Sequence, residues 1–332
     1  MNNCMSRRTI LRAMALALVS LVTVGGMGTA AAQDFPTRAV RIIVPVPAGG
    51  SADLVARIVA ENLTKEWGQS VVVENRVGGN RSVAALAIMQ APPDGHMILW
   101  GTGPVFTTNP LLFKNLAYDP ERDFRMVSLA AVTPNVLGIY PKLPFKTVAE
   151  LVAYARANPG KLTFASSGMA SSGHLGGEMM MQLGKIDMKH IPYRGAAPGW
   201  NDVMGGHVSM MWDGIPAVIG QINTGMLRAL AVGSKERWPA LPDVPTAIEA
   251  GLPGFVSESW FAAAVAIKTP DPIVRNISAS MSRILRSPEI AARVVQMGAR
   301  PLGTTPEETT AYVRETTALW KNVIDAAKIV VE

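Results

Sequence analysis

The sequence is poor in the residues that carry most metal and thiol chemistry. It has one cysteine and four histidines in 332 residues. The cysteine, Cys4, precedes the first apolar segment, so the rest of the chain has no disulfide and no thiol chemistry. The histidines, His96, His174, His190 and His207, lack the spacing of metal ligands. We therefore expect neither a metal nor a cofactor.

Common enzyme signatures are also missing. The chain has no G-x-S-x-G elbow, no H-E-x-x-H zinc motif and no G-x-x-x-x-G-K-S/T phosphate loop. Gly101-Thr102-Gly103 lacks the third glycine of a dinucleotide fingerprint. These absences predict a protein that is not an enzyme. A secreted hydrolase of carboxylate esters is the weaker alternative, because the sequence shows no positioned nucleophile and base.

Clustered charge and long apolar runs are absent too. The chain has 31 Lys and Arg against 25 Asp and Glu, but three of the arginines lie within the first twelve residues. The remaining basic residues form no cluster of the kind that a nucleic-acid-binding protein needs, so we expect no nucleic-acid partner. No apolar stretch reaches the roughly 18 to 20 residues that cross a bilayer.

The first 32 residues have the pattern of a secretion signal. Three arginines within residues 7–12 precede an apolar stretch at 13–24, and small residues end at Ala32. This order predicts a cleavable signal peptide at 1–32, cut near Ala32, and an exported protein. The paired arginines resemble a twin-arginine signal, although Sec signals carry them too, and the export route stays open.

The rest of the chain alternates buried strands with helices. Val40–Val46 is a β-branched apolar run, typical of a buried strand. Apolar residues from Leu54 to Trp67 recur at helical spacing, and Val71–Val73 is the next short strand. Two strands around one helix favour parallel pairing. Because strands return at Leu162–Ala165 and Val208–Trp212, we predict an α/β fold with mostly parallel sheets flanked by helices.

The length of the chain after residue 32 is enough for two packed domains of ordinary size. No low-complexity or charged linker separates two halves. We therefore expect two α/β lobes and a chain that crosses between them more than once.

Two loops lie where a predicted strand gives way to a predicted helix. Ligands of open parallel sheets sit at such places, where the first helical N–H groups lack partners and the helix dipole favours an anion. Residues 46–53 and 166–174 are rich in glycine, alanine and serine, which let a carboxylate approach the backbone and supply hydroxyl donors. The candidate ligand-binding residues of these loops are Val46, Ala48, Gly49, Gly50, Ser51, Ala52, Asp53, Ser166, Ser167, Gly168, Ser171, Ser172 and His174.

Several charged or polar candidates have a structural alternative. Asp53 would repel a bound anion, so a role as a helix cap or first-turn acid is at least as consistent with its position. Asp213, at the end of a predicted strand, carries the same two interpretations. His174 fits a hydrogen-bonding residue at a helix start better than a catalyst. Arg194 follows a strand, where solvent exposure and ligand contact both stay open.

A set of short motifs runs in order along almost the whole chain after residue 32. They are Arg41–Pro45, Ala48–Asp53, Val73–Arg76, Pro93–Gly95, Asn109–Pro110, Tyr118–Pro120, Asp123–Phe124, Pro192–Gly195, Gly205–Gly206, Ala229–Val232 and Leu241–Thr246. This ordered set resembles the substrate-binding receptors of tripartite tricarboxylate transporters, often called Bug proteins.

The resemblance implies a two-lobed periplasmic binding protein fold, similar to type II, with a hinge between lobes that close on the ligand. It implies a first domain built from 33–133 and 257–332 and a second domain built from 134–256. In such proteins backbone amides and water hold a ligand carboxylate. Those groups map here onto the loops 48–53 and 166–172.

The resemblance also extends the candidate site and implies a function. Tyr193 and Asp213 join the candidate ligand-binding residues. The implied function is capture of a small carboxylate in the periplasm and its delivery to membrane permease subunits by a monomeric receptor. A liganded co-receptor for a sensor kinase is the alternative. The ligand stays open among di- or tricarboxylates, acidic amino acids and aromatic carboxylates.

Four departures from the family pattern prevent the transfer of any relative's ligand. Val46 stands where an aromatic residue is common, and Phe106 where a small, polar or histidine residue is frequent. Gly214 replaces a common asparagine, and residues 79–82 lack the usual additional glycines. These changes are expected to alter the shape and polarity of the pocket.

Overall fold

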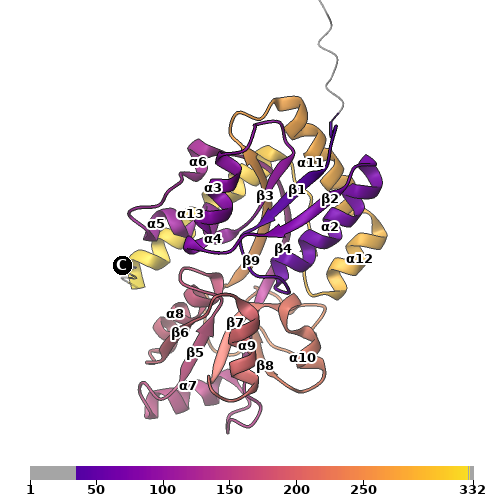
Figure 1. Cartoon of the computed structure of the whole chain (residues 1–332). Helices are drawn as coiled ribbons and strands as arrows, with labels where there is room; N and C mark the ends of the chain where they lie inside the picture. The colour runs from indigo at the N-terminus through magenta and orange to yellow at the C-terminus, as the bar shows by residue number, and fades with distance from the viewer. Residues whose placement is uncertain (1–34, 328, 330–332) are drawn as a thin grey trace, which may run out of the picture. The chain divides into compact units, whose positions relative to one another are not determined.

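The computed structural model describes residues 35–327 and 329, and the helices and strands of these residues lie in the compact unit Pro36–Glu332 (Figure 1). The strands are β1 (Val40–Val44), β2 (Val71–Asn75), β3 (Met97–Thr102), β4 (Phe124–Ile139), β5 (Thr163–Ser166), β6 (Lys189–Pro192), β7 (Met210–Gly214), β8 (Arg228–Val232), β9 (Glu258–Ala266) and β10 (Arg300–Pro301). The longer helices are α2 (Ser51–Trp67), α3 (Ser82–Met89), α7 (Val148–Ala157), α8 (Ser172–Gly184), α9 (Ala196–Met204), α11 (Asp271–Arg286), α12 (Pro288–Gln296) and α13 (Pro306–Ala327). The short ones are α4 (Gly103–Phe106), α5 (Thr108–Leu112), α6 (Pro120–Asp123), α10 (Ile219–Asn223), η1 (Gly79–Arg81) and η2 (Ile215–Ala217). Among the described residues no helix is long and apolar enough to cross a membrane.

One long strand, β4, belongs to two groups of strands in the order β2-β1-β3-β9-β4-β7-β5-β6. β4 pairs with β9 from Phe124 to Pro134 and with β7 from Asn135 to Ile139. We call the elements on the β9 side the first lobe and those on the β7 side the second lobe. The pairing partner of β4 thus changes from β9 to β7 between Pro134 and Asn135. The domain limits expected from the sequence, at 133 and 257, stay a prediction.

The sheet is mixed rather than mostly parallel. β1 pairs in parallel with β2 and β3, and β5 pairs in parallel with β6 and β7, as the βαβ order predicts. β4 runs antiparallel to β7, β8, β9 and β10, and β9 also runs antiparallel to β3. The pattern of apolar residues could not reveal this, because a strand buried on both faces reads as an apolar run in either direction.

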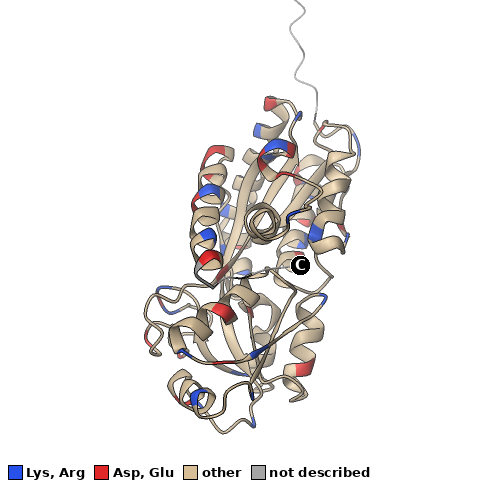
Figure 2. Cartoon of the chain, turned by 90° about the vertical axis from the view of Figure 1, so that its left-hand side faces the viewer, with Lys and Arg blue, Asp and Glu red and all other residues tan. Residues whose placement is uncertain are grey.

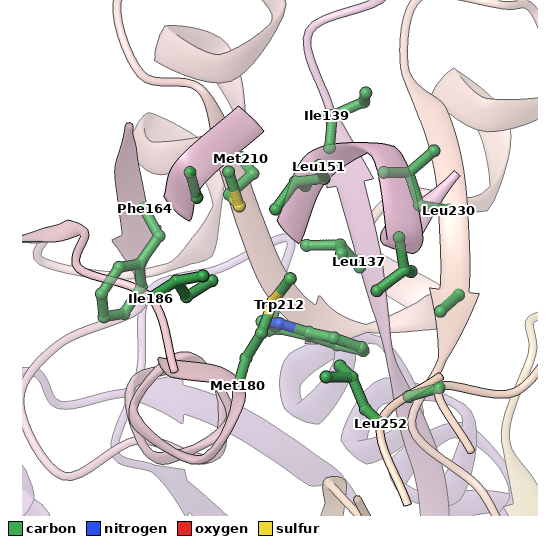
Figure 3. Close-up of a cluster of buried hydrophobic side chains, with 14 of the residues drawn as sticks. Leu137, Ile139, Leu151, Phe164, Met180, Ile186, Met210, Trp212, Leu230 and Leu252 are labelled. Carbon is green, nitrogen blue, oxygen red and sulfur yellow. The ribbon is translucent and has the colours of Figure 1, made fainter. Parts of the chain in front are cut away.

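Each lobe has its own apolar core. In the second lobe, Trp212 stacks on Phe255 with ring centroids 4.6 Å apart, and Leu137, Met180 and Leu252 belong to the same cluster (Figure 3). In the first lobe, a separate cluster gathers residues of β1, β3, β4 and β9. These two cores fix the ends of β1, β5 and β7, from which the loops of the site emerge.

Helix α2 shows how the sequence forms these elements. Its buried residues include Val55, Ile58, Val59 and Leu63, which confirms the helical spacing of apolar side chains. The helix ends at Gly68, whose φ of 64° is a left-handed cap that glycine adopts without strain. The apolar face of α2 packs on β1 and β2, and this packing holds the first turn of the helix beyond the carboxyl end of β1.

Candidate functional site

A cavity of about 80 Å³ lies where the two predicted loops meet. A single water molecule needs roughly 10–15 Å³ of cavity volume measured in this way, so the cavity has room for about five to eight water-sized groups. A ligand with a short carbon chain matches this size. From the first loop the cavity is lined by Val46, Pro47, Ala48, Gly50, Ser51 and Ala52, and from the second by Ser167, Ala170, Ser171, Ser172 and Leu175.

Three helices begin at this cavity. α2 starts at Ser51 after Gly50, and no side chain caps its first turn. α8 starts at Ser172, and the hydroxyl of Ser171 accepts a hydrogen bond from the N–H of His174 at 3.2 Å. The third helix, α9, starts after Gly195, again without a side-chain cap. The free N–H groups and the dipoles of these first turns make the cavity favourable for an anion.

Asp53 closes the first loop instead of lining the cavity. Its carboxylate accepts hydrogen bonds from the N–H of Gly49 at 3.0 Å, from Arg57 Nε at 2.9 Å and from Asn75 Nδ2 at 2.9 Å. Burial alone would raise the pKa of Asp53, but the hydrogen bonds from Arg57, Gly49 and Asn75 outweigh it and hold the pKa below its ordinary value. The geometry therefore matches the structural interpretation of Asp53.

Ser166 and His174 lie behind the second loop, and neither is among the residues that line the cavity. Ser166 Oγ lies 2.7 Å from His190 Nε2 and donates to the carbonyl of Gly168 at 3.0 Å. The ring of His174 stacks on His190 at 4.1 Å, and its Nδ1 accepts from the N–H of Ala170 at 3.2 Å. These contacts fix the backbone that carries Ser167 to Ser172.

The Ser166–His190 pair resembles a nucleophile with its base, but its surroundings do not suit that role. Ser166 is fully buried and does not line the cavity. Burial, with a smaller contribution from His174, lowers the pKa of His190 to about 3, so its ring is neutral at ordinary pH. A buried serine away from the cavity cannot reach a substrate there.

The other predicted residues fall into two groups. Gly168 and Tyr193 line a groove that adjoins the cavity, and both hollows are lined by Val46, Pro47, Arg81, Ser167 and Gly195. Tyr193 donates a short hydrogen bond to Asp202. Gly49 lines neither hollow.

Asp213 lies at the end of β7 and lines the cavity. Its Oδ2 is buried without a hydrogen-bond partner among the residues that the structure describes. Burial raises the pKa of Asp213 to about 6, and the backbone of Gly214, the side chain of Trp200 and the charge of Arg81 act in the opposite direction. An unpaired, buried carboxylate oxygen of this kind is free to contact a ligand group.

Sequence reasoning missed about two thirds of the residues that line the cavity. Thr102 ends strand β3 and helix α4 follows it directly, so the rule that found the first two loops would also have found it. Ser259 and Trp260 come from β9, which returns late in the chain, and no local pattern connects them to the loops. The residues missed are Pro47, Arg81, Thr102, Gly103, Pro104, Thr107, Thr108, Ala170, Leu175, Gly195, Ala196, Ala197, Glu258, Ser259, Trp260, Phe261 and Trp320.

A series of hydrogen bonds between hydroxyl and amide groups connects the lining of the cavity to the point where β4 passes from one lobe to the other. The hydroxyls of Ser172 and Ser259 lie 2.7 Å apart. Ser259 donates to Asn135 Oδ1 at 2.8 Å, and Asn135 Nδ2 donates to Ser257 Oγ at 2.7 Å. One end of the cavity is thus bonded to the residues where β4 changes lobes.

Comparison with known proteins shows the family to which the chain belongs. Residues 55–329 match the family model described as the tripartite tricarboxylate transporter family receptor, TctC. An R. palustris protein solved with adipate is similar at 35% identity and a TM-score of 0.87, covering 89% of this chain and 99% of that chain. MatC from Rhodopseudomonas palustris with bound malate is 32% identical with a TM-score of 0.82, covering 87% and 100%.

The periplasmic binding protein BugD is also similar, at 33% identity and a TM-score of 0.84 over 90% of this chain and all of that chain. These likenesses confirm the α/β periplasmic binding protein fold and the resemblance on which it was predicted. The chain belongs to the TctC family of tripartite tricarboxylate transporter receptors, a family of binding proteins and not of enzymes.

Proposed function

We propose that this chain is a periplasmic receptor that captures a small carboxylate in the cavity and delivers it to the membrane permease of a tripartite transporter. The observation that carries the proposal is the start of α2, α8 and α9 at one cavity. The first turns of helices stabilise an anion without a charged side chain, because most of their N–H groups lack an intrahelical partner. Relatives solved with adipate and with malate support the same ligand class.

The other walls of the cavity suit the rest of such a ligand. Trp260, Phe261 and Trp320 present apolar surface to a carbon chain. Thr102 Oγ1 has no hydrogen-bond partner among the described residues, so it remains available to a polar ligand group. The site therefore combines apolar walls with a few polar groups, as small-molecule sites do.

Export and delivery belong to the same proposal. The signal peptide predicted at 1–32 lies outside the described residues, and its cleavage near Ala32 would release the receptor to the periplasm. Closure of the two lobes around the ligand would then create the form that docks on the permease. A monomer is sufficient for this role, because the cavity is built from one chain.

A thermal-shift screen of residues 33–332 tests the proposed ligand class. We expect a carboxylate to raise the melting temperature, because a ligand that binds only the folded state stabilises it by about 2.7 kcal/mol at a hundred times its Kd. The amide of the same compound should give no shift. A shift of equal size with the amide, or none across aliphatic, amino-acid and aromatic carboxylates after removal of co-purified ligand, would contradict the proposal.

A further inference from the structure

Arg81 is a buried arginine at the cavity wall without a charged partner in contact. It is 8% exposed. Its Nε has no hydrogen-bond partner within the described part of the chain, where no carboxylate oxygen lies within 4.0 Å of its guanidinium either. Arg57, by contrast, is paired with Asp53, and Figure 2 shows basic and acidic residues spread over both lobes. Burying an arginine in this way is unfavourable unless an anion joins it.

The backbone that carries Arg81 is held in a conformation that favours glycine. φ is 49° at Asn80 and 77° at Arg81. Asn109 Nδ2 donates to the carbonyl of Asn80 at 2.6 Å, and Tyr118 accepts from the same amide group at 3.1 Å. These buried contacts from outside the turn fix the direction in which the arginine enters the cavity. Strain of this kind persists where the side chain has a function that glycine cannot supply.

Arg81 is the single basic side chain among the residues that line the cavity. Asp213 and Glu258 line it as well, from β7 and β9. Asp213 attracts Arg81 from beyond contact distance, and Arg300 and Lys235 act on Glu258 from outside the cavity. The guanidinium therefore keeps its five donors largely free for an incoming anion.

We propose that Arg81 binds a second carboxylate of the ligand, so that this receptor selects dicarboxylates over monocarboxylates of the same chain length. The inference rests on the proposed function, which assigns the first carboxylate to the helix starts of α2, α8 and α9. A guanidinium can hold the second carboxylate with two parallel hydrogen bonds, a geometry that a neutral chain end cannot match.

Isothermal titration with matched ligand pairs tests the proposal. Succinate with butanoate and adipate with hexanoate differ within each pair by one carboxylate. The variant Arg81→Gly suits the positive φ and removes the guanidinium, while Arg275→Gln removes an exposed arginine of α11 that lines neither the cavity nor the adjoining groove, as the matched control. Arg81→Gln provides a second variant of similar side-chain length, should the glycine variant fold poorly.

The expected result is a loss of about ten- to a hundredfold in dicarboxylate affinity in Arg81→Gly, with monocarboxylate affinity changed by less than about threefold. Arg275→Gln should match the wild type with both ligands. The role of Arg81 would be overturned by unchanged dicarboxylate affinity in both Arg81 variants, or by an equal loss of affinity for the dicarboxylate and the monocarboxylate of a pair. Either result would leave the proposed function standing. A wild-type protein that binds no carboxylate would overturn the proposed function, and this inference with it.

Discussion

Asp213 joins the chemistry of the cavity to the stability of the fold. Its Oδ2 lacks a hydrogen-bond partner among the described residues, and burial raises its pKa to about 6. In an unfolded chain an aspartate has a pKa near 3.9. Between about pH 4 and pH 6 the folded state therefore holds a proton that the unfolded state has lost. The free energy of unfolding must fall with rising pH across this window, and the loss stays complete above it.

The variant Asp213→Asn should remove this pH dependence. A shift of about two pKa units corresponds to on the order of 3 kcal/mol, which the wild type loses between pH 4 and pH 7 and the variant does not. Urea unfolding of both proteins at pH 4, 5, 6 and 7 gives the difference in free energy at each pH. Because all other groups are shared, a difference that stays constant with pH would show that Asp213 ionises normally.

Residues differ in how far the sequence predicts their place. Asp213 was identified as a candidate because it ends a strand, and it does line the cavity. The sequence marks Arg81 only as part of residues 79–82, which depart from the glycine-rich pattern of the family. Its backbone is left-handed and its side chain is buried, and neither property follows from the preference of arginine for exposed, right-handed positions.

At the scale of elements, the first turn of α2 offers a direct way to block the cavity. Gly50 has a φ of −83°, and a β-carbon there would meet nothing closer than the carbonyl of Pro47 at 4.0 Å. A side chain at this position is therefore tolerated by the backbone and by its neighbours. Because Gly50 lines the cavity, that side chain would extend toward the ligand space.

The variant Gly50→Glu should lose carboxylate binding and keep its fold. The new carboxylate lies at the helix start, where it competes with the ligand for the same N–H groups and repels it. We expect affinity to fall by more than about a hundredfold in titration calorimetry, with a melting temperature within a few degrees of the wild type. The control Gly220→Glu places the same residue at an exposed position with no atom within 4 Å of its β-carbon. Wild-type affinity in Gly50→Glu would exclude the first loop from the site.

The strand–loop–helix pattern explains why two elements of the site were predictable and others were not. The loops before α2 and α8 are local features, since a buried strand, small residues and an amphipathic helix follow one another directly. β9 and α13 contribute Trp260 and Trp320 from the last quarter of the chain. The position of Trp260 at the cavity depends on the antiparallel pairing of β9 with β3 and β4, which no local sequence pattern specifies.

At the scale of the whole molecule, β4 couples the two lobes. Where it crosses, the N–H of Asn135 donates to the carbonyl of Ser257 at 2.9 Å, and the N–H of Gly233 donates to the carbonyl of Asn135 at 2.7 Å. We propose that this crossing is the hinge between the lobes. Asn135 is fully buried, so opening one lobe would expose polar groups that are bonded to the other.

The shared strand predicts that both lobes unfold together. Differential scanning calorimetry of residues 33–332 should give one transition with equal calorimetric and van't Hoff enthalpies, because loss of β4 removes its pairing with β9 and β10 in the first lobe and with β7 and β8 in the second. A saturating carboxylate should move the whole transition to higher temperature, since it contacts both lobes through the loops of β1 and β5. Two transitions, of which only one moves with ligand, would show that the lobes are independent and that the cavity is completed by one of them alone.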